Sequence, residues 1–378
     1  MFKNLARASM PMLAAMLAVL AATTTPKNAR AQAQSSAQAP SQTGSAPLKV
    51  GFVYVSPIGQ AGWTFQHEQG RLALQRALGA SVQTSAVEAV AEGADGERVM
   101  RDMAAQGVGL IFATSFGYLE GGLRVAAEFP GVRIEHAGGY KTALNLNTYN
   151  ARFYEGRWLA GWLAGKVSKS GVAGYVAGFP LPEVVQGVNA FTLGMRAANP
   201  KAEVRVLWLN AWFDPPRERE AAVTLINAGA DVLGNHSGSP AVPQAAQERG
   251  VKVVGYQSDM KHVAPDAQLA AVTADWGGYY TQVARAVRAG TWAAKPVWGG
   301  MKDGMVRVEA LHPSLPKPVV TELEQRRAAL IAGKDGPFFG RLVDQDGRVR
   351  LEAGRLDDGA VAVMVWFVLG VVGVLPRR

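Results

Sequence analysis

The sequence predicts an α/β protein with two doubly wound lobes, in which each lobe has a parallel β-sheet covered by helices on both faces and a hinge joins the two. Three observations support this prediction. Short apolar runs alternate with helix-length amphipathic segments, the pattern of β-α-β units. The alternation starts again after Asn150. About 330 residues follow the N-terminal leader, more than a single hydrophobic core usually holds.

The first 31 residues have the features of a cleaved secretory signal peptide. Lys3 and Arg7 precede an apolar run, "MPMLAAMLAVLAA", that is too short to span a bilayer. Ala29-Arg30-Ala31 then gives an A-x-A cleavage pattern. Residues 32–47 are small, polar and Pro-containing and predict a disordered leader. An uncleaved anchor is the alternative, and because the chain has no Cys it offers no site for a lipid at a mature N-terminal cysteine.

The first lobe is predicted from elements that follow one another between residues 49 and 139. Strands are expected where apolar or β-branched runs are bounded by turn residues, and helices where apolar residues recur at helical spacing. The expected strands are 49–55, 81–90, 109–114 and 132–139, and the expected helices are 64–79, 96–107 and 119–131.

The second lobe repeats this rhythm after a hinge near residues 146–152. Its expected helices are 154–171, 182–199, 216–229 and 240–250, and its expected strands are 172–178, 202–212, 231–237 and 251–258. A helix at 277–292 and a strand at 303–309 are expected to cross back to the first lobe, before a last helix at 318–334. We therefore expect the first lobe to comprise residues 48–148 and about 274–312, and the second to comprise residues 149–273 and about 313–378.

The C-terminal tail has 16 consecutive apolar residues, Ala360 to Leu375. A bilayer core needs about 20, and this run contains two glycines and many β-branched residues. We expect a buried strand and a helical turn that close a lobe, with a membrane anchor as the alternative.

Charge and motif content argue against several classes of function. The formal net charge is +9, but four of the basic residues precede residue 32, and no run of five or six like charges occurs, so a nucleic-acid groove is not expected. The chain has no Cys nucleophile and no G-x-S-x-G elbow, and its five His show no paired metal spacing. We expect no catalytic residues, no metal and no cofactor.

Candidate ligand-binding residues follow the strands, because ligands of open α/β sheets bind beyond the carboxyl ends of the strands. Aromatic side chains recur at these ends in both lobes, each accompanied by single polar groups. Two facing aromatic side chains would sandwich a flat ring, and the polar groups would bind its edge. The predicted ligand-binding residues are Trp63, Ser115, Phe116, Asn210, Trp212, Phe213, Asp214, His236, Gln257, Asp259 and Trp276. For each aromatic, the alternative is a place in a lobe core.

Several stretches resemble one known family. "KVGFVYVSPIGQAGWTFQHEQG", "VLWLNAWFDPPREREAAVTLINAGADVL", "ERGVKVVGYQSDM" and "VWGGMKDGMVRV" are similar to the BMP (basic membrane protein) family of ABC-transporter substrate-binding proteins. The resemblance runs from about Lys49 to the end of the chain. It implies the type I periplasmic-binding fold, a periplasmic monomer, an ABC permease as partner, and a purine nucleoside or adenine as ligand.

The resemblance also assigns roles to particular residues. Trp63 matches a position where an aromatic stacks on the purine from one lobe, and Trp212 or Phe213 matches the stacking position of the other lobe. Nucleoside-binding relatives carry an aspartate near the ribose in the motif that matches "GYQSDM"; here Gln257 stands at its first acidic position and only Asp259 keeps a carboxylate. Gly238 stands where many relatives have a polar residue. These differences favour adenine over a nucleoside.

An ABC importer subunit is therefore the favoured function. A ligand-loaded sensor that signals to a membrane partner is the alternative, and an enzyme such as a nucleoside hydrolase is disfavoured because no catalytic constellation is found.

Overall fold

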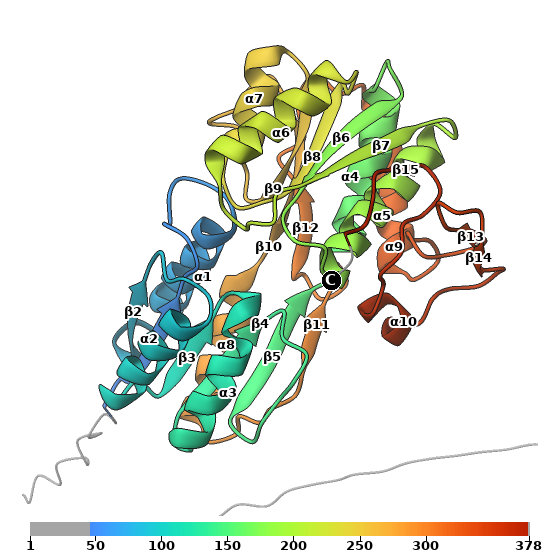
Figure 1. Ribbon diagram of the computed structural model, residues 1–378. Helices are drawn as coiled ribbons and strands as arrows, with labels where there is room; N and C mark the ends of the chain where they lie inside the picture. Colours follow the sequence, from blue (N-terminus) through green and yellow to red (C-terminus); the bar gives the residue numbers. More distant parts are fainter. Residues whose placement is uncertain (1–45, 377–378) are drawn as a thin grey trace, which may run out of the picture. The chain divides into compact units, whose positions relative to one another are not determined.

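The computed structural model describes residues 46–376. The predicted signal peptide and most of the predicted leader lie outside these residues. The described chain contains two large β-sheets with helices on both faces, so the α/β prediction with two doubly wound lobes is confirmed (Figure 1).

The first lobe is built on a six-stranded parallel sheet in the order β11-β5-β4-β3-β1-β2. Its strands are β1 (Leu48–Val53), β2 (Val82–Val87), β3 (Leu110–Ala113), β4 (Arg133–Ala137), β5 (Leu146–Ala151) and β11 (Val297–Gly299). Its helices are α1 (Trp63–Leu78), α2 (Ala94–Ala105), α3 (Leu119–Glu128) and α8 (Trp276–Arg288), with 3-10 turns at Gly79–Ser81 and Phe116–Tyr118.

Alternation along the strands explains the two layers of helices in the first lobe. Val50 and Phe52 point to the face covered by α1 and α8, whereas Val53 points to the opposite face, where it packs in a cluster with residues of α2 and α3. Both faces are therefore buried, which is why these strands are continuous apolar runs in the sequence.

The second lobe is built on a seven-stranded sheet in the order β12-β10-β9-β8-β6-β7-β15. Its strands are β6 (Val172–Ala177), β7 (Glu203–Trp208), β8 (Val232–His236), β9 (Lys252–Gln257), β10 (Gln268–Ala274), β12 (Val306–Glu309) and β15 (Val371–Val372). Its helices are α4 (Phe153–Val167), α5 (Pro182–Ala198), α6 (Pro215–Asn227), α7 (Ala241–Arg249), α9 (Lys317–Ile331) and α10 (Asp358–Ala362). A small hairpin, β13 (Leu342–Val343) and β14 (Val349–Leu351), follows α9.

The strand Val306–Glu309 corrects one expectation. We placed residues 303–309 in the first lobe, but β12 pairs with β10 in the second sheet and is its only antiparallel strand among the described residues. The pairing Val272↔Val308 buries the alternate residues Val306 and Val308 and leaves Arg307 and Glu309 exposed. Local sequence identifies such a strand but does not identify its partner.

Three connections join the lobes. The chain leaves the first sheet after β5, returns to it through α8 after β10, and leaves it again between β11 and β12. The carboxyl ends of the parallel strands of the two sheets therefore face each other across one cleft.

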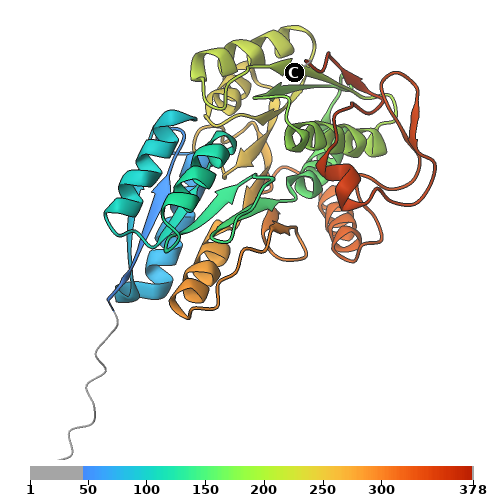
Figure 2. The same ribbon diagram turned by 60° about the horizontal axis from the view of Figure 1, so that its bottom comes forward.

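The C-terminal tail forms the short helix α10 and the strand β15, which pairs with β7 at the edge of the second sheet. Met364, Phe367 and Val368 are buried, while Val363 and Val365 are exposed. Figures 1 and 2 both show this red segment beside α5 and α9 and away from α2 and α3. Within residues 46–376, no helix is both long and apolar enough to cross a membrane.

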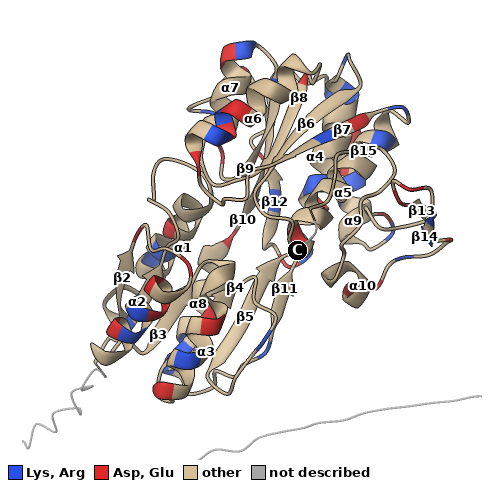
Figure 3. Ribbon diagram, in the orientation of Figure 1, with Lys and Arg blue, Asp and Glu red and all other residues tan. Residues whose placement is uncertain are grey.

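Charged residues are distributed over both lobes. Figure 3 shows basic and acidic residues interspersed on helices such as α2 and α3. Arg101 and Arg124 both pair with Glu97, at 2.6 and 2.5 Å, which ties these two helices together on the surface. This arrangement is typical of a solvated protein surface.

Candidate ligand-binding site

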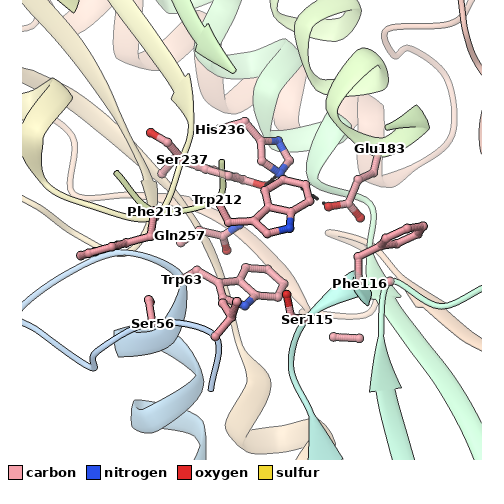
Figure 4. Close-up of a pocket in the computed structure, with 15 residues that line it drawn as sticks. Ser56, Trp63, Ser115, Phe116, Glu183, Trp212, Phe213, His236, Ser237 and Gln257 are labelled. Carbon is pink, nitrogen blue, oxygen red and sulfur yellow. Dashed lines mark hydrogen bonds and ion pairs between the residues drawn. The ribbon is translucent and has the colours of Figure 1, made fainter. Parts of the chain in front are cut away.

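One cavity lies in the cleft where the strand ends of both lobes meet (Figure 4). It has about 580 Å³ of space free of protein atoms, counting the part open to solvent. The lining residues of the first lobe are Val55, Ser56, Trp63, Ser115, Phe116, Ala137 and Gly138, and those of the second are Glu183, Trp212, Phe213, His236, Ser237, Gly238, Tyr256 and Gln257. Each lies at or just beyond the carboxyl end of a strand, or in the first turn of the helix that follows.

Two indoles line this cavity, one from each lobe. Trp63 is the first residue of α1, and its Nε1–H donates to the carbonyl of Thr114 at 2.7 Å, which fixes the ring. Its edge packs on His67, with centroids 4.2 Å apart. Trp212 follows β7 and packs edge-on against Phe179 at 4.8 Å. Figure 4 shows one ring from each lobe with open space between them. This geometry suits a flat aromatic guest.

Two further aromatic side chains lie at opposite ends of the cavity. Phe213 lies at one end with 37% of its surface exposed, and Phe116 lies at the other end, next to Glu183 (Figure 4). A guest between the indoles would therefore have apolar groups at both ends and polar groups along its edge.

Glu183 and His236 form the main ionisable pair of the site. Glu183 lies in the first turn of α5, and its carboxylate accepts from Asn150 Nδ2 at 2.7 Å and lies 3.5 Å from His236 Nε2. Burial by itself would raise the pKa of Glu183, but hydrogen bonds from His236 and Asn150 outweigh it and lower the pKa. Burial lowers the pKa of His236. At neutral pH the site therefore holds a carboxylate beside a neutral imidazole.

Gln257 has an unusual conformation at the end of β9. Its φ is +70°, which a non-glycine residue rarely adopts, and its side chain is almost fully buried. Its Oε1 has no hydrogen-bond partner in the described part of the chain. Backbone strain and an unsatisfied buried acceptor are both costly, and they concentrate at functional sites. A ligand N–H would satisfy this oxygen.

A buried arginine lies behind the second-lobe wall. Arg157 on α4 is fully buried, stacks on the Tyr256 ring at 3.4 Å and donates to the carbonyl of Asn235. Within residues 46–376 it forms no ion pair with a carboxylate. Its charge contributes to lowering the pKa of nearby His236.

Most of the predicted site residues line this cavity: Trp63, Ser115, Phe116, Trp212, Phe213, His236 and Gln257. Four do not. Trp276 is 1% exposed and stacks on His67 at 4.8 Å inside the first lobe, behind Trp63. The strand-end rule placed it near the cleft, but its ring points into the core.

The three other residues outside the cavity serve the local structure of their loops. Asn210 is exposed with a φ of +52°, in a turn. Asp214 caps α6 by accepting from Arg217 N at 3.2 Å. Asp259 is exposed and accepts from Gln268 Nε2 at 2.7 Å. A polar residue after a strand often stabilises the next turn or helix, and sequence position alone does not separate that role from ligand contact.

The predicted ligand-binding residues left out Glu183, Ser56, Ser237 and Tyr256, which line the cavity. Glu183 follows Pro182 in the first turn of α5, where an acid ordinarily interacts with the helix N-terminus. The sequence signal that could have identified it was its position just beyond the carboxyl end of β6.

Within residues 46–376, no group of three His, Cys, Asp or Glu side chains is arranged to hold a metal ion. The cavity offers groups for binding: two indole rings, one carboxylate, one imidazole, one amide and the hydroxyls of Ser56, Ser115, Ser237 and Tyr256.

Comparison with known proteins identifies the family. Residues 48–332 match the Bmp family model, described as ABC transporter substrate-binding protein PnrA-like. The chain is 48% identical over 331 residues to a purine-binding protein of Brucella abortus, covering 87% of this chain and 94% of that protein. It is 36% identical over 329 residues to a putative ABC transporter glucose-binding protein of Haloferax volcanii, covering 87% and 81%.

Solved structures agree on the fold. An ABC-transporter solute-binding protein from Conexibacter woesei superposes with a TM-score of 0.63 at 22% identity, over 76% of this chain and 97% of that one. A solute-binding protein from Aeropyrum pernix superposes with a TM-score of 0.66 at 17% identity, over 83% and 95%. The expected type I periplasmic-binding fold is thus confirmed.

These matches are to substrate-binding proteins rather than enzymes, as expected. Such proteins bind a small solute outside the cytoplasm and present it to a transporter permease. The chain belongs to the Bmp family of PnrA-like ABC transporter substrate-binding proteins.

Proposed function

We propose that this protein is a monomeric periplasmic receptor that captures a free purine base, with adenine favoured, and delivers it to an ABC permease. The observation that carries the proposal is the pair of indoles, Trp63 and Trp212, which line the cavity from opposite lobes (Figure 4). A purine has two flat faces for these rings and an edge of donors and acceptors for Glu183 and Gln257. The Brucella relative, named as purine-binding, supports the same ligand class.

The polar groups of the cavity support a base rather than a sugar. The hydroxyl of Ser56 pairs with Thr64 at 2.7 Å, and that of Ser115 donates to Glu92 at 2.6 Å. These two hydroxyls are already engaged, which leaves mainly Glu183, His236, Ser237 and Gln257 to bind polar atoms of a guest. A hexose offers several hydroxyls, and each one buried without a partner costs about 1–3 kcal/mol.

The same reasoning favours a free base over a nucleoside. In the motif where nucleoside-binding relatives carry an aspartate, Gln257 lines the cavity, whereas the Asp259 carboxylate binds Gln268 outside it. No carboxylate of this motif lies among the residues lining the cavity, which removes the group that would hold ribose hydroxyls.

Calorimetry tests the ligand. Purified protein titrated with adenine, guanine, hypoxanthine, adenosine and glucose should bind adenine most tightly. The Kd should lie below about 100 μM, which corresponds to roughly −5.5 kcal/mol. Weak binding of every purine, or tighter binding of glucose, would contradict the proposal.

Loss of labelled adenine uptake in a strain lacking this protein would distinguish transport from sensing.

The pH dependence of binding tests the role of Glu183. Because the pKa of Glu183 is lowered from 4.5, the carboxylate stays charged as pH falls from about 8 to 6, and adenine affinity should be constant over that range. Below this range His236 and then the carboxylate take up protons, and adenine affinity should fall. Glu183→Gln should weaken binding about 10- to 100-fold at pH 7. If Glu183→Gln binds adenine with the same Kd as the unmodified protein, adenine does not contact the Glu183 carboxylate. Circular dichroism at each pH controls for unfolding.

A further inference from the structure

A second cavity adjoins the first on the side of the hinge. Phe116, Gly138 and Glu183 line both cavities, so the two share one wall. The second, which we name the hinge-side cavity, has about 1460 Å³ of space by the same measure as the 580 Å³ of the first. Figure 4 shows Phe116 and Glu183 together at the end of the first cavity that leads to it.

The surface of the hinge-side cavity is mainly apolar. The side chains that give it this character are Tyr140, Leu181, Pro182, Val297, Trp298 and Val363. Two of its polar side chains are already engaged: the Asn150 amide donates to Glu183 at 2.7 Å and its oxygen accepts from Ala151 N at 2.8 Å, while Gln186 Nε2 donates to the carbonyl of Val361 at 2.7 Å. A guest there would find apolar contact rather than hydrogen bonds.

The walls of this cavity are held in place by specific contacts. The Arg152 guanidinium stacks on Trp298 at 4.4 Å, donates to the Trp298 carbonyl at 3.0 Å and pairs with Asp358 at 2.5 Å. Asp358 begins α10, the helix that Val363 follows. Tyr140 and Val363 nevertheless stay 66% and 68% exposed. Exposed apolar side chains around a formed cavity are typical of a surface that a ligand covers.

Glu183 lies where the two cavities meet, so it determines how a guest can extend from one into the other. Its carboxylate binds best to an N–H donor, and an adenine whose exocyclic amine carries one substituent still keeps one N–H. The N–H can then bind Glu183 while the substituent passes beside it, past Phe116. A ribose in the same place would bring hydroxyls against an apolar wall, which lacks partners for them.

We propose that the hinge-side cavity binds an apolar substituent on the exocyclic nitrogen of adenine, so that the ligands include N6-alkyl- and N6-aryl-adenines. This inference rests on the proposed purine-binding function and names a wider ligand class for the same site.

Calorimetry with N6-benzyladenine, adenine and adenosine tests it. N6-benzyladenine should bind at least about tenfold tighter than adenine, because the benzyl group leaves water for an apolar surface. Val363→Asp puts a charge at the wall of the hinge-side cavity and should remove most of this gain without changing adenine affinity. Val365→Asp is the matched control: Val365 is 59% exposed, two residues away and outside this cavity, so that variant should bind both ligands as the unmodified protein does.

The outcomes separate this inference from the proposed function. If adenine binds but N6-benzyladenine binds no tighter, or if Val363→Asp affects both ligands equally, the inference is wrong and the adenine proposal stands. Binding of N6-benzyladenine alone would support the inference and make substituted adenines the main ligands. If neither binds, both proposals fail.

Discussion

Replacement of Trp63 by alanine is expected to weaken adenine binding by roughly 5- to 150-fold, and Trp212→Ala should do the same. An aromatic ring stacked on a base contributes about 1–3 kcal/mol as measured by alanine substitution, and each tenfold in Kd corresponds to about 1.4 kcal/mol. The two rings lie on opposite faces of the cavity, so the double variant should lose detectable binding (Figure 4). Trp63→Phe and Trp212→Phe should recover part of the affinity, since each keeps a ring.

Trp208→Ala is the matched control for this pair. Trp208 is half-buried, lies four residues before Trp212, stacks on Phe367 at 6.2 Å and donates to the Val374 carbonyl at 2.9 Å, all outside the cavity. Its loss should lower the melting temperature but leave the Kd for adenine unchanged. If Trp63→Ala and Trp212→Ala remain folded and bind adenine with unaltered Kd, the rings do not stack on the ligand. Intrinsic fluorescence should also change on binding, through Trp63 and Trp212.

The elements of this fold were predictable where burial on both faces makes a strand a continuous apolar run. β1, β3, β6 and β9 are of this kind and were found from sequence alone. The strand β5 was missed because its sequence, "LNTYNA", contains two Asn and a Thr, lacks a continuous apolar run and was interpreted as a hinge. β12 was found but assigned to the wrong sheet, because its pairing with β10 is a long-range contact that no local pattern encodes.

The site was predictable to the level of the loop and not of the side chain. The strand-end rule identified the loops that carry Trp63, Trp212 and Gln257, and all three line the cavity. Within one loop, however, Trp212 faces the cavity while Asp214 caps α6. Which role each residue takes depends on the backbone path after β7.

Glu183 shows a further limit of sequence reasoning. Its two neighbours, Asn150 and His236, come from the hinge strand of the first lobe and a strand end of the second. An acid in the first turn of a helix has an ordinary explanation in the helix dipole. Its carboxylate lines a cavity formed by both lobes. The tertiary structure brings the lobes together there, and no local sequence pattern encodes that contact.

Gly62→Ala is expected to weaken adenine binding at least about tenfold by preventing the lobes from closing. Gly62 of the first lobe donates its N–H to Ser258 Oγ of the second at 2.8 Å, beside the cavity. A Cβ on Gly62 would lie 2.0 Å from the carbonyl oxygen of Gly238, which is also on the second lobe. Real Cβ atoms do not approach a backbone atom so closely, so the lobes would have to separate. An open cleft exposes the ligand faces that stacking would otherwise bury, and affinity falls accordingly.

A second glycine separates this collision from simple backbone strain. Gly62 has a φ of +93°, and alanine is disfavoured there whatever its surroundings. Gly59, three residues earlier in the same loop, has a φ of +58°, but a Cβ there would meet no atom within 4 Å. Gly59→Ala therefore adds strain without the collision and should bind adenine nearly as well as the unmodified protein. Small-angle scattering should show a smaller ligand-induced compaction for Gly62→Ala than for Gly59→Ala. Equal affinity and equal compaction in the two variants would mean that contact between Gly62 and Gly238 is not required for binding, and that closure around the ligand depends on other contacts between the lobes.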